Sequence, residues 1–335
     1  MSLSIGIVGL PNVGKSTLFN ALTKKSVPAE NYPFCTIDPS VGIVPVPDER
    51  VAKLSELSKS KKTIPAVIEF VDIAGLVAGA SKGEGLGNKF LSNIKEVDAI
   101  AHVVRVFEDN SVIHVANKVD PMQDVGVINL ELTLADLETV SKRINNLVRD
   151  VKRGDKEAIL ENNILLKTEK VLGEGRFASE ANLTTEEKFK IKSLNLLTLK
   201  PMLYVLNVSE ANENVEVKFP ESLKGAAMFV KVDPIFESGF DDLIQQSYKL
   251  LGLETFLTTG EDETRAWTIK QGSTAPEAGA AIHTDFKEKF IRAEVITYEK
   301  LMEAGAYGKA REKGWVRTEG KDYIVKDGDV IEFLV

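Results

Sequence analysis

The residues whose types and spacing best match a phosphate chemistry lie near the N-terminus, in the segment GLPNVGKST at 9–17. This segment matches G-x-x-x-x-G-K-[ST], a pattern whose glycines let backbone N–H groups turn toward phosphate oxygens. An apolar run at 4–10 precedes it and helical spacing follows it, which is the strand–loop–helix context that the pattern requires. The residues expected to surround the phosphates are Asn12, Val13, Gly14, Lys15, Ser16 and Thr17.

Two side chains of this loop have predicted roles of their own. Lys15 is expected to reach the β- and γ-phosphates and to take part in catalysis. The hydroxyl of Ser16 is expected to bind Mg²⁺. The helix that follows adds the positive end of its dipole to the same place.

Further residues for the same chemistry follow in the expected order. Thr36, in the proline-punctuated segment 31–39, is expected to offer a second hydroxyl to Mg²⁺. Asp72 ends a second buried strand, predicted at 65–73, where a carboxylate suits a magnesium site. The N–H of Gly75 is expected to face the γ-phosphate.

The next position departs from the usual pattern. Many GTP-hydrolysing enzymes have glutamine after that glycine, where it orients the attacking water. This chain has Leu76, which cannot hydrogen-bond water. The glycine-rich stretch 75–88 is typical of a mobile switch segment. Either hydrolysis is very slow, or another group positions the water.

Two segments compete for the role of reading the nucleotide base. NKVD, at 117–120, has the spelling that reads guanine in GTP-binding proteins. The predicted strand 98–107 leaves only 108–111 before the next apolar run, too few residues for a parallel crossover. NVSE, at 207–210, follows the predicted strand 201–206 and has ample chain before it. Topology therefore favours NVSE and predicts that NKVD is a decoy.

The residues of NVSE favour adenine. In the usual N-K-x-D motif the aspartate accepts two N–H groups of guanine, whereas Glu210 is one methylene longer and misplaces that pair. Val208 stands where a lysine normally packs. A site that loses the guanine-specific geometry can admit adenine. Asn207, Val208 and Glu210 are the predicted base contacts, and ATP is expected to bind at least as well as GTP.

These motifs, with NYPFCTIDP, DIAGL, RAWTIKQGSTAPEAGAAIHTDF and GKDYIVKDGDVIEF, resemble those of the YchF family, the Obg-like ATPases. The resemblance covers nearly the whole chain. It implies P-loop ATPases that bind ribosomes and have leucine in place of the catalytic glutamine. It also implies that His114 handles the attacking water. Asn12 is further expected to help seat a K⁺ ion near the phosphates, as in related switch NTPases.

Two departures from the family pattern concern the far side of the base. The stretch 211–240 is shorter than is usual in the family. The Ser-Ala pair that contacts the base in many GTPases is absent, and its place reads MFVKVDP, at 228–234. Base contacts on that side are therefore left open by the sequence.

The pattern along the chain predicts an α/β fold with three parts. Residues 1–128 and 200–251 are expected to form a P-loop (G) domain with a mostly parallel sheet. Residues 129–199 are expected to form an inserted antiparallel helical hairpin. Residues 252–335 change to short strands and resemble a TGS domain, a β-grasp module of several translation-linked proteins.

A heptad-like stripe supports the hairpin, and helical patterns continue at 157–171 and 185–199. The stripe consists of Leu130, Leu134, Leu137, Ile144, Val148 and Val151. Its helix also carries the basic residues Lys142, Arg143, Arg149, Lys152 and Arg153. These form either a solvated helix face or a surface for RNA.

Composition sets outer limits. The chain has 335 residues and a single cysteine, Cys35, so no intrachain disulfide can form. Its net charge of −8 disfavours a protein that coats polyanions in general. We find no signal peptide and no apolar run near ~18 residues. A cytoplasmic protein without membrane contact is expected.

The favoured interpretation is a regulatory ATPase whose switch segments control how the helical and TGS parts bind the ribosome. The expected partners are ATP, GTP more weakly, and the ribosome, at its large subunit and with ribosomal RNA in contact. A GTP-specific switch that uses NKVD is one alternative, and a nucleotide-gated RNA binder with incidental hydrolysis is another. A metabolic kinase is disfavoured because no second substrate site is evident.

Overall fold

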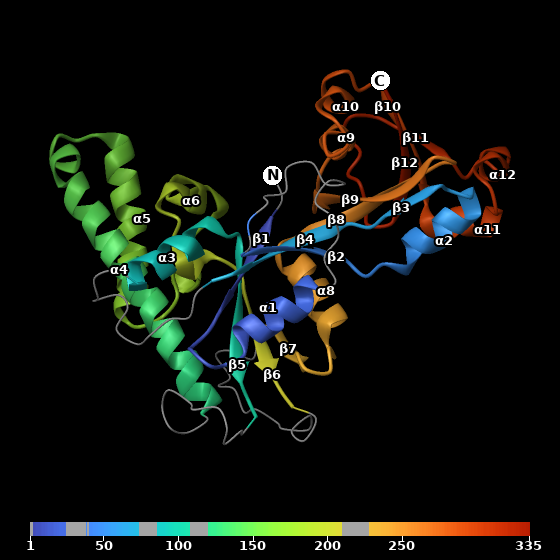
Figure 1. The fold of residues 1–335 in the computed structure, drawn as a ribbon. Coiled ribbons are helices and arrows are strands. Elements are labelled where there is room, and N and C mark those ends of the chain that lie inside the picture. The colour runs from blue at the N-terminus through green and yellow to red at the C-terminus, as the bar shows by residue number, and fades with distance from the viewer. Residues whose placement is uncertain (1–2, 25–37, 39, 74–85, 108–119, 210–227) are drawn as a thin grey trace.

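The computed structural model describes residues 3–24, 38, 40–73, 86–107, 120–209 and 228–335. Figure 1 shows a first sheet from which two long helices, α4 (Pro121–Lys152) and α5 (Lys156–Gly173), project to one side, and a second sheet built mainly from the C-terminal part. Among these residues no helix has both the length and the apolar character needed to cross a membrane.

The first sheet has six strands in the order β2-β4-β1-β5-β6-β7. Neighbouring strands are parallel except β2, which is antiparallel to β4. The central strands are apolar and buried along both faces, as in parallel sheets covered by helices. The predicted α/β fold with a mostly parallel sheet is confirmed. The strands are β1 (Ser4–Val8), β2 (Val41–Pro45), β4 (Val67–Asp72), β5 (Ala99–Arg105), β6 (Met202–Asn207) and β7 (Met228–Val232).

Helices cover both faces of this sheet. In Figure 1, α1 (Lys15–Thr23) and α8 (Phe240–Leu250) lie on one side, while α3 (Leu86–Glu96) and the start of α4 lie on the other. Leu18 and Phe240 pack from the first side, and Ile94 and Ile128 from the second, into one large core. Since the strands are parallel, their carboxyl ends meet at one edge, where ligands bind in this class of fold.

A helical arm joins β5 to β6 and has its own core. After α4 and α5 the chain returns through η2 (Ala178–Ala181), α6 (Thr185–Lys190), η3 (Lys192–Leu194) and η4 (Leu197–Leu199). The predicted single helix over 185–199 is wrong, because α6 ends at Lys190. The buried carboxylate of Asp136 on α4 accepts the N–H groups of Leu197 and Thr198 at 2.8 and 2.7 Å, and draws this segment into short turns.

The buried seam of α4 differs from the predicted stripe. Leu130 is 53% exposed and Val148 is 40% exposed. Leu137, Ile144 and Val151 of the stripe are partly buried against the core of the arm, as predicted, while the fully buried positions are Ile128, Leu132 and, against α5, Val140 and Leu147. The prediction was wrong here because the first turns of α4 pack on the sheet, so the contact surface of the helix rotates between its two ends.

The second sheet has the order β11-β10-β12-β8-β9-β3. Its elements are β8 (Leu253–Thr259), β9 (Glu263–Lys270), α9 (Ala275–Gly279), α10 (Thr284–Glu288), β10 (Arg292–Thr297), α11 (Tyr298–Ala304), α12 (Tyr307–Glu312), β11 (Arg317–Glu319) and β12 (Asp329–Leu334). Its last strand, β3 (Lys62–Ile64), comes from the N-terminal half, next to α2 (Glu49–Ser58), and runs parallel to β9. The two halves of the chain are therefore interleaved.

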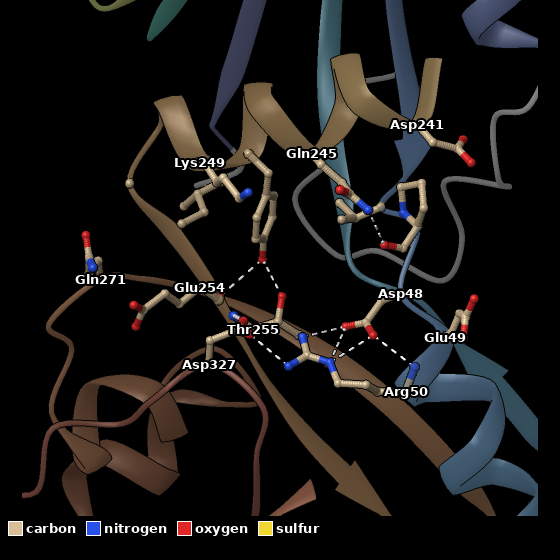
Figure 2. A pocket seen from close by; sticks show the side chains of 15 residues that line it. Asp48, Glu49, Arg50, Asp241, Gln245, Lys249, Glu254, Thr255, Gln271 and Asp327 are labelled. Atoms are coloured by element: carbon tan, nitrogen blue, oxygen red, sulfur yellow. Dashed lines mark hydrogen bonds and ion pairs between the residues drawn. The ribbon is translucent and has the colours of Figure 1, made fainter. Parts of the chain in front are cut away.

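An ion cluster also joins the two halves, at a cleft of about 800 Å³ between α2, α8 and β8. Figure 2 shows Arg50 between Asp48 and Asp327. Arg50 Nη2 lies 2.7 Å from Asp48, and Nη1 lies 2.7 Å from Asp327, whose other oxygen accepts the N–H of Thr255 at 3.0 Å. The hydrogen bond to Asp48 is the main reason that the pKa of Arg50 is raised. A side chain at Gly328 would collide with this guanidinium, since its Cβ would lie 2.6 Å from Nη1.

We predict that Arg50→Ala lowers the free energy of unfolding by about 1–3 kcal/mol, because two carboxylates lose their partner at a half-buried junction. Chemical denaturation monitored by circular dichroism measures the change. Lys53→Ala is the matched control: it breaks the exposed pair with Glu49 one turn away, which should cost less than ~1 kcal/mol. Equal effects of the two substitutions would contradict the role given to the cluster.

Candidate active site

The loop between β1 and α1 has the backbone shape of a phosphate-binding loop. Asn12 and Gly14 have left-handed backbone, with φ of 63° and 96°. Gly14 is also the N-cap residue of α1 and makes no side-chain cap, so the first N–H groups of the helix are directed toward the loop. Left-handed residues in a turn point successive N–H groups into one concave space, where an anion binds.

Lys15 lies inside this loop. It is 7% exposed, and its Nζ donates a hydrogen bond to the carbonyl oxygen of Leu10 at 2.8 Å. Burial lowers the pKa of Lys15, and the negative charge of Asp72 opposes that effect. The ammonium group is thus held at the loop by a backbone oxygen and a nearby carboxylate, in the place predicted for a contact with phosphate.

Ser16 and Asp72 meet at the ends of two neighbouring strands. β1 pairs with β4 so that Ile7 lies beside Asp72, and the hydroxyl of Ser16 lies near enough to this carboxylate to affect its pKa. Burial raises the pKa of Asp72, while Lys15 and Ser16 each oppose that rise. A hydroxyl and a carboxylate at one point are oxygen ligands of the kind that Mg²⁺ takes, so this pair suits the metal.

Asn207 connects the loop to the far side of the sheet. It is the last residue of β6, is 4% exposed, and donates from Nδ2 to the carbonyl oxygen of Val13 at 2.8 Å, across 194 residues of sequence. A Cβ at Gly14 would lie 2.2 Å from this Nδ2. Glycine is therefore required at 14 both by its φ and by the amide packed against it. We call this contact the Asn207–Val13 bridge.

Val208 differs from its predicted role in one respect. Its N–H donates to the carbonyl oxygen of Val232 at 2.9 Å, which continues the pairing of β6 with β7. Its side chain is buried among apolar residues that include Val125 of α4 and Leu206. Val208 can contact a nucleotide through its backbone, while its side chain packs in the core.

The last residue of the competing motif NKVD is described, and it caps a helix. Asp120, its last residue, is the N-cap of α4, and its carboxylate accepts the N–H of Gln123 at 3.1 Å. In the described part of the chain, α4 is the element that follows β5, and the next strand of that sheet is β6, which ends in Asn207. The topological premise of the prediction is confirmed.

Several predicted site residues lie outside the described residues. Thr36, Gly75, His114 and Glu210 belong to this group, as does Leu76. They follow elements that end at the same edge of the sheet or connect to it: α1, β4, β5 and β6. Their roles stay predictions.

Two further buried residues lie near this edge and were not predicted from the sequence. Arg105 is 1% exposed at the end of β5, pairs in register with Asn207, and donates from Nε to the carbonyl oxygen of Phe107 at 3.1 Å. Its guanidinium carbon lies 4.6 Å from the centre of the Phe107 ring. One signal was available, because an arginine inside an apolar strand requires a local partner.

The other missed residue is His102, which is 1% exposed in the middle of β5. Neither ring nitrogen has a hydrogen-bond partner among the described residues, and the ring lies 5.3 Å from that of Tyr204. Burial lowers the pKa of His102 to about 3, with a contribution from the charge of Lys15. This histidine is neutral at physiological pH and belongs to the core behind the loop.

Comparison with known proteins extends these observations. Residues 253–335 match a family model named YchF-GTPase_C, described as a protein of unknown function, and residues 4–148 match the model of 50S ribosome-binding GTPases. The chain is 52% identical to the ribosome-binding ATPase YchF of Bacillus subtilis, with 99% of both chains covered. It is 48% identical to the protein of the same name from Haemophilus influenzae, again with 99% of both covered.

A solved structure agrees with these matches. The structure of the Schizosaccharomyces pombe YchF GTPase superposes with a TM-score of 0.86 at 37% sequence identity, and the match covers 99% of this chain and 98% of that one. The fold described above is therefore shared over its full length.

We predict that Gly14→Ala weakens nucleotide binding by about tenfold or more, because a Cβ there strains the loop and displaces the amide of Asn207. Titration of the purified variant with a fluorescent ATP analogue measures the loss. Gly173→Ala is the control: that glycine lies at the end of α5 with open space around its Cβ position, so binding should not change. Unimpaired binding by Gly14→Ala would show that the bridge does not shape the loop.

Proposed function

The chain belongs to the YchF family, and on that premise we propose that it is a ribosome-binding ATPase that binds Mg²⁺-ATP at the carboxyl edge of the first sheet. The observation that supports this most strongly is the Asn207–Val13 bridge, which places the candidate base-reading residue directly on the candidate phosphate loop. Both ends of one nucleotide would then be held by parts of the chain that already contact each other.

We infer from the loop which residue would contact each part of the triphosphate and its metal. The backbone N–H groups around Gly14 would receive phosphate oxygens, and Lys15 would exchange its bond to Leu10 for the β- and γ-phosphates. Ser16, Thr36 and Asp72 would hold Mg²⁺, directly or through water. When bound, the metal neutralises charge that develops on the phosphates. Gly75 would offer its N–H to the γ-phosphate, and Asn12 would help seat a K⁺ ion.

The water for hydrolysis needs a residue to position it. Leu76 cannot do so, and we propose His114, which comes after β5 in the sequence; β5 ends at the edge of the sheet where the phosphates would lie. His102 is on that strand too, but it is buried in the core and cannot reach the site. If no residue takes this role, the protein is a nucleotide-gated ribosome binder with incidental hydrolysis. The leucine at position 76 is the reason to retain this second candidate function.

Base recognition is proposed at NVSE. Asn207 and the backbone of Val208 would face the base, and Glu210, longer than the guanine-reading aspartate, would not meet both guanine donors. ATP is then bound at least as well as GTP. A GTP-specific switch that uses NKVD is disfavoured, because Asp120 caps a helix instead.

We propose that the ribosome, at its large subunit, is bound through the helical arm and the C-terminal sheet. The arm carries Arg149, Lys152 and Arg153 near the end of α4. Arg143 is not free for this purpose, since its Nε and Nη2 bind both carboxylate oxygens of Glu161 at 2.7 and 2.8 Å.

The chain is proposed to act in the cytoplasm. We propose the parts 1–128 and 200–251 as the G domain, 129–199 as the arm and 252–335 as the TGS domain. To the last of these the chain adds β3 from the N-terminal half.

We predict that Lys15→Ala removes most ATP binding and that His114→Ala lowers kcat while leaving the Kd for ATP nearly unchanged. The lysine contacts ground-state phosphates, whereas the histidine acts on the attacking water. Isothermal titration and a phosphate-release assay separate the two effects. His283→Ala, in the C-terminal part, is the control and should match the parent in both. Parent-like turnover by His114→Ala would remove that residue from the mechanism.

We predict that Asp120→Ala leaves the ratio of ATP to GTP affinity near its starting value and lowers the free energy of unfolding by ~1 kcal/mol, as loss of an N-cap does. Glu210→Asp should move the ratio toward GTP. Competition binding with both nucleotides measures the ratio. A parent with strong GTP selectivity that collapses in Asp120→Ala would make NKVD the base-reading motif after all.

We predict that the protein cosediments with ribosomes at low salt and that the replacement of Arg149, Lys152 and Arg153 by alanine weakens this binding and flattens its salt dependence. Contacts to phosphates release counterions, so each lost contact reduces the salt slope by about one. Replacement of Lys167, Arg176 and Lys190, which are paired with Glu187, Glu174 and Glu157, is the charge-matched control. Sedimentation at background level in low salt would reject ribosome binding itself.

A further inference from the structure

The turn between β7 and α8, at 233–239, borders the proposed base site. Asn207 pairs in register with Val232, and the N–H of Val208 donates to the carbonyl oxygen of Val232. The residues that follow β7 therefore lie beside the residues that follow β6. A purine placed at Asn207 has this turn along one of its edges. The sequence left contacts on this side open.

The backbone N–H groups at the start of this turn donate to acceptors within the turn itself. The carboxylate oxygen Oδ1 of Asp233 accepts the N–H of Ile235 at 2.9 Å and that of Phe236 at 3.2 Å. Asp233 and Ser238 exchange backbone N–H···O bonds with each other, both at 3.1 Å. Pro234 has no N–H at all. Over the described stretch 233–236, every backbone donor is thus either absent or engaged.

The outward surface of the turn is apolar. Ile235 is 77% exposed and Phe236 is 62% exposed, which is unusual for side chains of this size. Asp233 is 5% exposed, so the carboxylate that accepts the N–H groups of the turn is buried beneath its surface. The turn is also fixed at its far end, where Gly239 has a φ of 76° and a Cβ would lie 2.1 Å from the carbonyl oxygen of Lys231.

An edge whose backbone donors are absent or already engaged distinguishes purines by the group at position 6. Guanine presents an oxygen there, which needs a donor, whereas adenine presents an amino group, which needs an acceptor or tolerates solvent. A buried or half-buried acceptor that is left unpaired costs affinity, and a site that offers it no donor selects against it.

We propose that the turn at 233–236, through Pro234 and the carboxylate of Asp233, is a specificity element that disfavours 6-oxopurine nucleotides. This inference rests on the proposed function, because it requires the base to lie at Asn207. It deepens that proposal by assigning part of the selectivity for ATP to β7, independently of Glu210. The readout is the 6-position of the base, whereas the carboxylate of an N-x-x-D or N-x-x-E motif reads the 1- and 2-positions.

The test uses ATP, GTP and ITP with the full-length protein. ITP has the 6-oxygen and the N1–H of GTP without its 2-amino group, so the comparison of ATP with ITP removes the 2-position, and the change of the ATP/ITP ratio in a variant of the turn reports on the 6-position. Competition binding should show ITP weaker than ATP in the parent. Pro234→Ala supplies one N–H to the turn and should move the ATP/ITP affinity ratio toward ITP by about two- to tenfold, the effect of one hydrogen bond. Asp233→Ala frees two N–H groups and should move it in the same direction.

A control makes the result specific. Pro276→Ala changes a proline at the start of α9, far from this edge, and should leave the ratio unchanged. Pro234→Ala decides the matter alone if Asp233→Ala does not fold.

The outcomes separate the two proposals. A parent that binds no nucleoside triphosphate overturns the proposed function. A parent that binds ATP and ITP equally, or a ratio that stays within twofold in Pro234→Ala, overturns this inference and leaves the ATPase proposal standing.

Discussion

One hydrogen bond between distant parts of the chain organises the candidate site. The amide of Asn207 reaches from the end of β6 across β5 to the carbonyl oxygen of Val13, so the side of the sheet that would face a base is tied to the loop that would hold phosphates. Both partners are buried, and a buried amide without its acceptor would cost about 1–3 kcal/mol. The constraint extends to Gly14, where no other residue leaves room for the amide. It also extends to Arg105, which pairs in register with Asn207 on β5, the strand between β1 and β6. The loop therefore depends on a strand some two hundred residues away.

The other parts of the molecule are attached to this edge by polar contacts of the same long-range kind. Asp136 fixes the return of the helical arm just before β6, so the position of the arm and the start of the strand that ends in Asn207 are linked. Arg50 connects the segment after β2 to the C-terminal sheet through Asp327. A change at the site that moved β2, β4 or β6 would reach the arm and the second sheet through these contacts. This is the physical arrangement that a nucleotide-controlled ribosome binder requires.

Local pattern predicted much of this structure, and its failures have physical causes. The strands at 4–10, 65–73, 98–107 and 201–206 were predictable because apolar runs bounded by turn residues specify buried strands. The crossover argument placed Asn207 correctly at a strand end, since it depends on chain length alone. The stripe on α4 was misplaced at Leu130 and Val148, because one helix packs on two different partners. The burial of Arg105 and the pairing of β3 with β9 depend on tertiary contacts, which no local pattern contains.

The pairing of β3 with β9 has a consequence for how the chain is made. Lys61, directly before β3, is hydrogen-bonded to residues 261 and 262, so the partner emerges from the ribosome about 200 residues later. At the usual ~5–20 residues per second of synthesis, the edge formed by β3 waits roughly 10–40 seconds for its neighbour. Until then its backbone N–H and C=O groups are unpaired, and an unpaired strand edge is a site of wrong association. β3 is short, and Lys61 and Lys62 stand before and at its start; both features weaken such an edge. The edge at β3 can complete its pairing only once β9 has been synthesised, so this part of the N-terminal half matures together with the second sheet.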